Sequence, residues 1–414
     1  MALLVVAGSA AAGPYEDAKA AYERGDHATG YRLMRQLAEE GSADAQDTIG
    51  FAYQHGVGVA KDYAEALKWY RKAAKQGLAD AQVHLGLMYV EGLGVPRNPA
   101  EAAKLFRKAA DQGDSDGETN LGALYHDGRG VPRDPAEGLR LFRRAAARGH
   151  ANAQYNLGLA YLQGKGVKSD YLEAAKWYRL AAQQGHAGAQ LDLGYLYFHG
   201  RGVAQDRAEA MRLYRQAAEQ GDATAQYELA AGYFRGEGLP QDHAEAVKWM
   251  RRAAERAHAA ARNELGSMYA RGSGIGQDHV EAARLFRLAA DQGHARAQYN
   301  LGRVYAHGEG VPASHEEAVK WYRRSADQGY AAAQHALGMS YAAGLGVRRD
   351  DVQAYKWFEL ALTGYPASDV MNRDAATRTR DTVGARMMPD QIQQARRLAA
   401  AFKPRREAPP PDRR

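Results

Sequence analysis

The chain contains 414 residues, of which 45% are hydrophobic and 25% charged, and it carries a formal net charge of +6. Its length favours several domains or a repeat array over one compact core, and its lack of cysteine excludes disulfides, thiolate catalysis and cysteine-based zinc sites. In residues 403–414 five Lys or Arg side chains stand against two acidic ones, so much of the positive charge lies in a tail and does not indicate a folded basic face for nucleic acid.

The first residues, 1–12, form an apolar run, MALLVVAGSAAA, that ends in small residues before a polar segment. This pattern predicts a truncated signal peptide, and with it a periplasmic or secreted protein. The alternative is an apolar terminus on a cytoplasmic protein, because the charged region that normally opens a signal peptide is missing. No other stretch approaches eighteen consecutive apolar residues, so we expect no integral membrane segment in the mature chain.

A repeat array follows. Residues 13–42 predict a degenerate helix pair that caps its N-terminal end, since the Gly-x-Gly turn of the later blocks is absent there. Residues 43–366 divide into nine consecutive blocks of 36 residues without an insertion, and a fixed period of this length indicates stacked repeats. Each block predicts two helices, which must stack on both neighbours to bury their apolar faces.

The first helix of each block carries a stripe of small and apolar residues at helical spacing, such as Ala153, Leu157, Gly158 and Tyr161. A glycine in mid-helix costs about 1 kcal/mol relative to alanine, so we expect it to permit a close backbone approach. The sixth block has Ala230 at this position, which predicts a slightly wider helix spacing there.

A Gly-x-Gly-Val turn ends the first helix, because glycine readily adopts the positive φ values that terminate helices. The second helix opens with an acidic residue three positions before a glutamate, as in Asp62 and Glu65, which is the spacing of a capping box. Tryptophans recur in one register of this helix, which favours the buried core over a ligand site. They are Trp69, Trp177, Trp249, Trp321 and Trp357.

The end of the chain has a different character. Residues 367–402 predict a helical C-terminal cap, and residues 403–414, KPRREAPPPDRR, predict a disordered basic tail. The fold class expected for the whole chain is therefore all-α, a right-handed α-solenoid of ten helix pairs followed by a helical cap.

The repeated pattern AxAQxxLGxxYxxGxGVxxDxxEAxKWYRxAAxQG resembles the Sel1-like repeat, a relative of the tetratricopeptide repeat with a longer internal turn, over residues 43–366. Departures from it are local: Gly117 and Glu118 replace Ala-Gln in the third block, Arg262 replaces Gln in the seventh, and Ala257 replaces the closing glycine of the sixth. The resemblance implies an adaptor that scaffolds protein complexes, often at bacterial envelopes.

The sequence offers no catalytic constellation. It contains no Ser-x-x-Lys, Gly-x-Ser-x-Gly, His-Glu-x-x-His or Gly-x-x-x-x-Gly-Lys motif, so we expect neither an enzyme nor a bound cofactor. Histidines align between blocks, but zinc ligands must converge within about 2 Å of one ion, whereas stacked helices lie about 8–10 Å apart. We therefore expect no metal site. We interpret these histidines as contacts with free carbonyls at helix C-termini; they are His150, His186, His258 and His294.

By analogy with tetratricopeptide repeats, five offsets around the leucine before the mid-helix glycine face the inside of the superhelix and are free to contact a ligand. Blocks one to three place acidic residues there, namely Asp44, Asp47, Asp80, Glu91, Asp116 and Asp127. Blocks four to eight place aromatic and basic residues there, and the candidate binding residues are Tyr155, Tyr195, Phe198, Tyr227, Phe234, Arg235, Arg271, Tyr299 and Arg303. Arg296 and His307 extend the basic end.

Aromatic and arginine side chains dominate binding hot spots. These residues therefore predict an adaptor or scaffold that binds a partner protein or peptide in this groove, with the acidic side of the partner toward the arginines. The alternative is a carbohydrate-binding or cell-wall-associated solenoid, in which the Tyr and Phe rings stack on sugars. A purely structural interpretation also stays open, in which the rings pack against neighbouring repeats and the charges are solvated.

Overall fold

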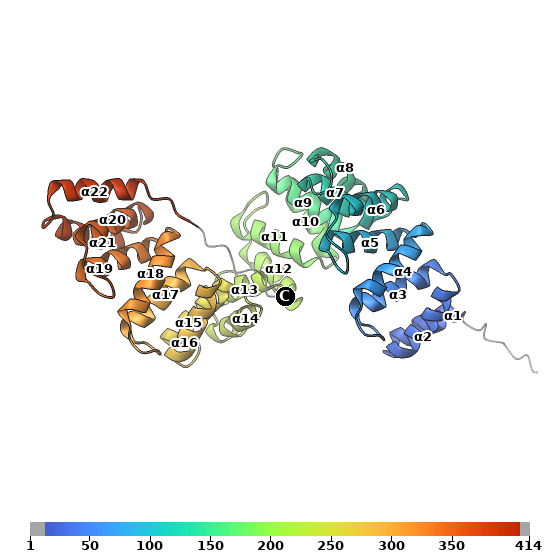
Figure 1. The fold of residues 1–414 in the computed structure, drawn as a ribbon, viewed down its shortest axis with the longest axis horizontal. Helices are drawn as coiled ribbons and strands as arrows, with labels where there is room; N and C mark the ends of the chain where they lie inside the picture. The colour runs from blue at the N-terminus through green and yellow to red at the C-terminus, as the bar shows by residue number, and fades with distance from the viewer. Residues whose placement is uncertain (1–12, 406–414) are drawn as a thin grey trace, which may run out of the picture. The chain divides into compact units, whose positions relative to one another are not determined.

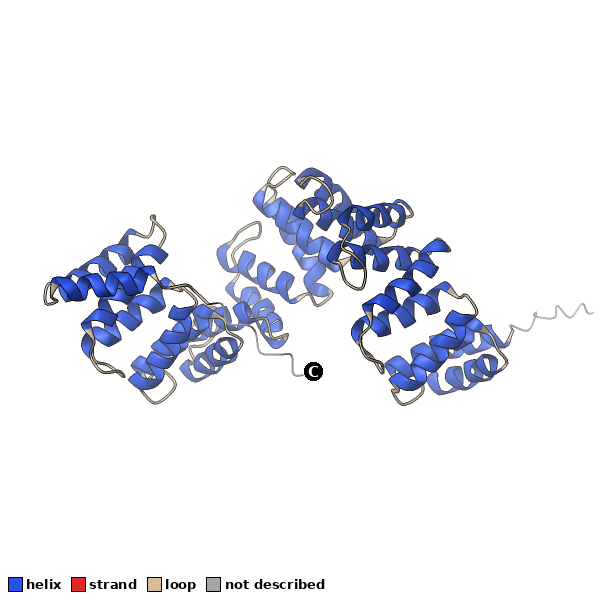
Figure 2. Cartoon of the chain, turned by 45° about the horizontal axis from the view of Figure 1, so that its top comes forward, coloured by secondary structure: helices blue, strands red, loops and turns tan. Residues whose placement is uncertain are grey.

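The computed structural model describes residues 13–405, and within that range it contains 22 α-helices and no strand. The helices form antiparallel pairs stacked in chain order (Figures 1 and 2), which confirms the predicted all-α solenoid. The stack divides into two compact units after Gln205, and each unit is described by itself. The predicted signal peptide, residues 1–12, and residues 406–414 of the predicted tail lie outside the described residues.

Unit 1 holds the first eleven helices. They are α1 (Pro14–Glu23), α2 (His27–Glu39), α3 (Ala43–His55), α4 (Tyr63–Lys75), α5 (Ala79–Glu91), α6 (Pro99–Asp111), α7 (Ser115–Asp127), α8 (Pro135–Ala147), α9 (Ala151–Gln163), α10 (Tyr171–Gln183) and α11 (Ala187–His199). The pair α1 and α2 packs against α3, in the region where the sequence predicts a shortened repeat.

Unit 2 holds the other eleven helices. They are α12 (Arg207–Glu219), α13 (Ala223–Arg235), α14 (His243–Glu255), α15 (Ala259–Arg271), α16 (His279–Asp291), α17 (Ala295–His307), α18 (His315–Asp327), α19 (Ala331–Ala343), α20 (Asp351–Gly364), α21 (Val370–Gly384) and α22 (Pro389–Ala400). Odd-numbered helices from α3 to α19 are the first helices of the repeats, and even-numbered ones from α4 to α20 are the second helices. Within the described residues, no helix combines the length and the apolar character needed to cross a membrane.

The second helices begin at side-chain caps, but only half of the expected capping box forms. The Asp62 carboxylate accepts hydrogen bonds from the backbone N–H groups of Ala64 (2.9 Å) and Glu65 (3.1 Å). The Glu65 side chain does not bond back to Asp62, because it pairs with Lys68 and the Asp62 N–H donates to the Tyr53 carbonyl (2.9 Å). That last bond anchors the start of the second helix on the first helix of the same repeat.

The mid-helix glycines make room for aromatic rings of the second helix. The close approach expected at these glycines is therefore between a ring and the backbone of the first helix. A Cβ atom on Gly158 would lie 2.6 Å from Cδ1 of Tyr178, far inside van der Waals contact. The same clash would arise between Gly86 and Phe106, at 2.5 Å. In the sixth block the ring is replaced by Met250, an unbranched and adaptable side chain, and this is the block in which Ala230 replaces the glycine.

Glutamines join successive repeats in a ladder. The Gln46 side-chain N–H donates to the Ala38 carbonyl (3.0 Å), and its Oε1 accepts from the Gln76 amide (2.9 Å) at the end of the second helix. The same Gln76 amide also donates to the Gly41 carbonyl (3.0 Å). Three further glutamine pairs repeat the bond between side chains, Gln112–Gln82, Gln184–Gln154 and Gln328–Gln298.

First helices also touch one another across repeats. Such contacts join α5 to α7 and α7 to α9 in unit 1, and α15 to α17 in unit 2. The first helices therefore lie next to one another along one side of each of these local stacks. The cap helices α21 and α22 then cover α20, where the Phe402 ring lies 5.6 Å from the Trp357 ring.

Candidate functional site

Three consecutive first helices of unit 2, α13, α15 and α17, together with Met250 of α14, line a cavity of about 430 Å³. Four of the nine candidate residues line it: Tyr227, Phe234, Arg235 and Arg271. The other lining residues are Ala231, Met250, Glu264, Met268 and Arg296. The repeat places these side chains together because equivalent positions, 36 residues apart, face the same side of the stack.

The cavity has an apolar floor and a basic rim. Met250 and Met268 are only 3% and 2% exposed, and they meet the half-buried Tyr227 and Phe234. Methionine adapts its shape readily, which suits a floor that receives side chains of varied outline. Arginines from three different helices surround this apolar surface, so an incoming group meets buried sulfur and ring atoms below and positive charge at the edge.

The three arginines at the rim differ in whether an acidic side chain neutralises their charge. Arg296 pairs with Glu264 at 2.9 Å, a contact that also ties α17 to α15, and Arg235 pairs with Glu237 at 2.9 Å. Arg271 is exposed and forms no ion pair among residues 13–405. The cavity therefore carries a positive charge that is free to meet a carboxylate.

Tyr227 forms one wall of the cavity, and a neighbouring ring restricts the movement of its side chain. Its ring stacks on His258, with centroids 5.0 Å apart and planes inclined by 29°. Burial raises the pKa of the Tyr227 hydroxyl, and the charges of Glu264 and Glu228 raise it further. The hydroxyl therefore stays protonated and can donate a hydrogen bond to a ligand.

Three candidate residues lie in unit 1 and do not join this cavity. Tyr155 stacks on His186 with centroids 4.4 Å apart. Tyr195 is 39% exposed, and its ring lies 4.3 Å from His199 and 5.4 Å from the guanidinium of Arg201. Phe198 also contacts His199, at 5.1 Å. These rings pack largely within the repeats of their own unit.

Tyr299 and Arg303 lie on α17 in unit 2 but outside the cavity. The Tyr299 ring is held between Tyr322 (5.9 Å) and Tyr330 (5.5 Å), so it belongs to the packing within its own repeat, residues 295–330. Arg303 is exposed.

The acidic residues expected in blocks one to three are partly neutralised. Asp47 pairs with His84 at 2.8 Å and Asp116 pairs with His150 at 3.2 Å. Burial lowers the pKa of His84, but its hydrogen bond to Asp47 and the nearby carboxylates outweigh burial, so the pKa is raised overall. Across residues 13–405, no three His, Asp or Glu side chains are grouped so that they could hold a metal ion.

The aligned histidines have a role opposite to the expected one. They do not contact carbonyls at the end of the second helix; their Nδ1 atoms accept hydrogen bonds from backbone N–H groups at the start of the following first helix. The distances are 3.0 Å from Ala189 to His186, 3.1 Å from Ala261 to His258 and 3.2 Å from Ala297 to His294. An accepting Nδ1 requires a neutral ring, and burial lowers the pKa of all three imidazoles.

Met250, Met268 and Glu264 line the cavity but were not among the residues predicted from the sequence, although one signal for the cavity was present. At the second position after the stripe leucine, blocks six and seven carry the small residues Ala231 and Ser267, whereas the flanking blocks carry Tyr195 and Arg303. Of these two small residues Ala231 lines the cavity, so its short side chain contributes to the open space.

Comparisons with known proteins agree with this architecture. The model of the Sel1 repeat matches nine consecutive segments, 43–78, 79–114, 115–150, 151–186, 187–222, 223–258, 259–294, 295–330 and 331–363. No curated protein matches the sequence. Among solved structures, a Sel1 repeat protein from Oxalobacter formigenes is 37% identical, covers 58% of this chain and 99% of its own, and superposes with a TM-score of 0.55.

A second solved structure is a protective antigen present in uropathogenic Escherichia coli strains, which displays the same repeat fold. It is 32% identical over 90% of this chain and 94% of its own length, with a TM-score of 0.46.

Proposed function

Because the chain belongs to the Sel1 repeat family, whose members generally mediate protein–protein interaction, we propose that it is an adaptor that binds an acidic segment of a partner protein. The segment docks in the cavity between α13, α15 and α17. Sel1 repeat solenoids are typically scaffolds without catalysis, and the proposed role needs only recognition.

The observation that carries this proposal is the union of a buried apolar floor with the unpaired charge of Arg271. Binding energy concentrates where an anchor side chain fills a desolvated pocket beside a well-placed arginine. A volume of about 430 Å³ accepts one large aliphatic or aromatic side chain with its neighbouring backbone. The Arg271 guanidinium can then hold a carboxylate with two parallel hydrogen bonds.

The spacing of the arginines suggests a pattern for the segment. Adjacent stacked helices lie about 8–10 Å apart, and an extended peptide advances about 3.3 Å per residue. Acidic side chains about three residues apart would therefore meet arginines on successive first helices. We expect an apolar anchor between or beside these acidic residues.

Ring packing favours a peptide over a sugar as the ligand. Carbohydrate recognition uses an open aromatic face, whereas the Tyr155 and Tyr227 faces already stack on His186 and His258. Retention of the protein on cell-wall polysaccharide would therefore contradict the proposal.

The test is a selection of random linear peptides displayed on phage against the full chain. We expect enriched sequences with an aromatic or large aliphatic residue flanked by Asp or Glu. A variant with Tyr227→Ala and Arg271→Ala together should lose these peptides. An Arg348→Ala variant, which removes an exposed arginine in the turn before α20, should keep them.

Enrichment of peptides without acidic residues, or equal binding to the double variant, would refute the cavity as the site. Binding of the chain to insoluble peptidoglycan that survives the double variant would instead favour the carbohydrate alternative.

A further inference from the structure

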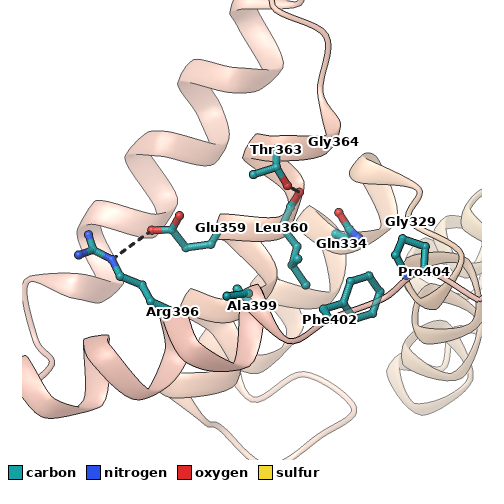
Figure 3. A pocket seen from close by; sticks show the side chains of 11 residues that line it. Gly329, Gln334, Glu359, Leu360, Thr363, Gly364, Arg396, Ala399, Phe402 and Pro404 are labelled. Carbon is teal, nitrogen blue, oxygen red and sulfur yellow. Dashed lines mark hydrogen bonds and ion pairs between the residues drawn. The ribbon is translucent and has the colours of Figure 1, made fainter.

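A second cavity, of about 480 Å³, lies at the C-terminal end of unit 2 and has no part in the site described above. Figure 3 shows its lining: Thr363 and Leu360 above, Ala399 below, and Gln334, Phe402 and Pro404 on the right. The ion pair of Arg396 and Glu359, 3.8 Å apart, stands at its edge. The lining is mainly apolar around one buried amide.

That amide belongs to the glutamine ladder. Gln334 is the ninth-block equivalent of Gln46 and Gln298, and its side-chain N–H donates to the Ala326 carbonyl at 3.3 Å, as theirs donate to Ala38 and Ala290. Because a carbonyl can accept only from the amide nitrogen, the orientation of the Gln334 side chain is fixed. Its oxygen, Oε1, is directed away from Ala326.

Oε1 of Gln334 lacks the glutamine partner that Gln46, Gln82, Gln154 and Gln298 have. Gln226 in the sixth block also lacks it, but its Oε1 is buried and the donor position there carries Arg256. In the eighth block, the Gln328 amide donates both to Gln298 Oε1 (2.8 Å) and to the Gly293 carbonyl (3.0 Å). In the first block, Gln76 donates in the same way to Gln46 and Gly41. One amide group therefore bridges two acceptors at each of these rungs.

The ninth block keeps both acceptors but not the donor. The acceptor positions are Gln334 and Gly329, and both line the cavity. The donor position is Gly364, whose missing side chain leaves the space open; a Cβ atom built there would lie 3.6 Å from Gln334 Oε1. Within residues 13–405 no group donates a hydrogen bond to this oxygen, although Gln334 is only 3% exposed.

We propose that this cavity is a binding site for a primary carboxamide, supplied by a glutamine or asparagine side chain of a peptide. The bound –NH2 group takes the place of the absent ladder glutamine and donates to Gln334 Oε1 and the Gly329 carbonyl. The aliphatic part of the ligand packs on Leu360, Ala399 and Phe402. A carboxylate is rejected because it would bring a third acceptor against two acceptors that no donor satisfies.

Geometry elsewhere in the chain indicates that the missing rung can be rebuilt. Gly364 lies opposite Ala331, with a Cβ–Cβ distance of 3.0 Å if a Cβ were added. In the first and eighth blocks the positions equivalent to Gly364 and Ala331 carry Gln76 with Ala43 and Gln328 with Ala295, so the repeat accommodates this combination. A Gly364→Gln variant should therefore fill the cavity with its own amide.

The experiment titrates the full-length protein with N-acetylglutamine N-methylamide while the side-chain amide resonances of its ¹⁵N-labelled glutamines are followed by NMR. The Gln334 signal is identified by its loss in Gln334→Met. We expect a saturable shift of this signal with a Kd of about 1 mM, the strength typical of a ligand of this size. The matched N-acetylglutamate and N-acetylmethionine N-methylamides should bind at least about tenfold more weakly, because each lacks the donor.

Two variants at position 364 distinguish the effect of a hydrogen-bond donor from the effect of filling the cavity. Gly364→Gln should abolish binding of the glutamine probe, whereas Gly364→Ala, which adds a methyl group without a donor, should retain the preference for the carboxamide. Absence of a saturable shift in the wild-type protein would show that water alone serves Gln334. Equal binding of the three probes, or equal loss in the two variants, would likewise overturn the proposal. None of these results depends on the site between α13 and α17.

Discussion

Glu118 on α7 is paired with Arg148, which follows α8, at the two positions where other repeats hold a pair of ladder glutamines. The Glu118 side chain is fully buried, and Arg144 supplies a second guanidinium at 2.7 Å. The third block has therefore exchanged a neutral hydrogen-bonded pair for a charged one. Both members have changed together, because a buried carboxylate without a cation would be strongly destabilising.

This exchange predicts a non-additive pair of substitutions. Arg148→Ala should lower the free energy of unfolding by about 2 kcal/mol, less than a fully buried pair because the arginine is partly exposed. The double variant Glu118→Gln with Arg148→Gln should rebuild a ladder rung and stay within about 1 kcal/mol of the wild type. Urea unfolding of the two variants measures the difference, and equal losses would contradict the ladder.

Ala257 is the only residue other than glycine with a positive φ, 61°, among residues 13–405. Other repeats have glycine there, for example Gly185 with φ of 86° and no neighbouring atom within 4 Å of an added Cβ. Ala257→Gly should therefore stabilise the protein by about 1 kcal/mol, and Gly185→Ala should destabilise it by a similar amount. Thermal unfolding measures whether each variant is more or less stable than the wild type. If Ala257→Gly is less stable, the Ala257 methyl group has a packing role.

The pairing of mid-helix glycines with rings also predicts a compensating double variant. Gly86→Ala should destabilise the chain by about 2 kcal/mol, because its Cβ would meet the Phe106 ring and overpacking outweighs the gain in helix propensity. Adding Phe106→Met copies the natural combination of Ala230 and Met250 and should recover more than half of the loss. If denaturant unfolding shows that Phe106→Met lowers the free energy of unfolding further, the Phe106 ring is not what requires glycine at position 86.

The histidine caps predict a loss of stability in mild acid. Burial lowers the pKa of His186, His258 and His294 from the ordinary value of 6.5 in the folded state. As the pH falls below 6.5, the unfolded chain takes up these protons before the folded chain does, so the free energy of unfolding decreases toward about pH 5. His84, whose pKa is raised, contributes with the opposite sign.

A variant with all three histidines changed to asparagine isolates this effect. Asparagine caps a helix as well as aspartate or serine does and has no proton to gain in this range. Urea unfolding at pH 7.5 and pH 5.5 should show a smaller pH dependence in the variant than in the wild type. An unchanged dependence would mean that the caps are not the titrating groups.

Much of the fold was predictable because the same 36-residue pattern occurs nine times in one register. Periodicity placed the helices, the turns and the buried Trp69, Trp249, Trp321 and Trp357. The capping box was only half right, because the Asp62 N–H has a better acceptor, Tyr53, that is distant in sequence. The glutamine ladder was missed for a similar reason: its partners are 30 residues apart, and only the joint change at Glu118 and Arg148 marked them as a pair.

The candidate site was predictable in part. Repeat offsets identified Tyr227, Phe234, Arg235 and Arg271, since equivalent positions share a face. Offsets alone could not tell that Tyr299 is covered by Tyr330, because that ring comes from the end of the same repeat, 31 residues further along the chain. The cavity itself depends in part on a short side chain, that of Ala231, at a position where the preceding repeat carries Tyr195.

A charge-swap titration tests most directly whether an acidic segment docks at Arg271. The best peptide selected on the wild-type protein is titrated against wild type, Arg271→Glu and the matched control Arg348→Glu by isothermal calorimetry. We expect Arg271→Glu to weaken binding at least about tenfold, which is about 1.4 kcal/mol, and Arg348→Glu to leave it unchanged. A peptide with its acidic residue changed to lysine should recover affinity for Arg271→Glu only. Equal affinities for all three proteins would contradict the account.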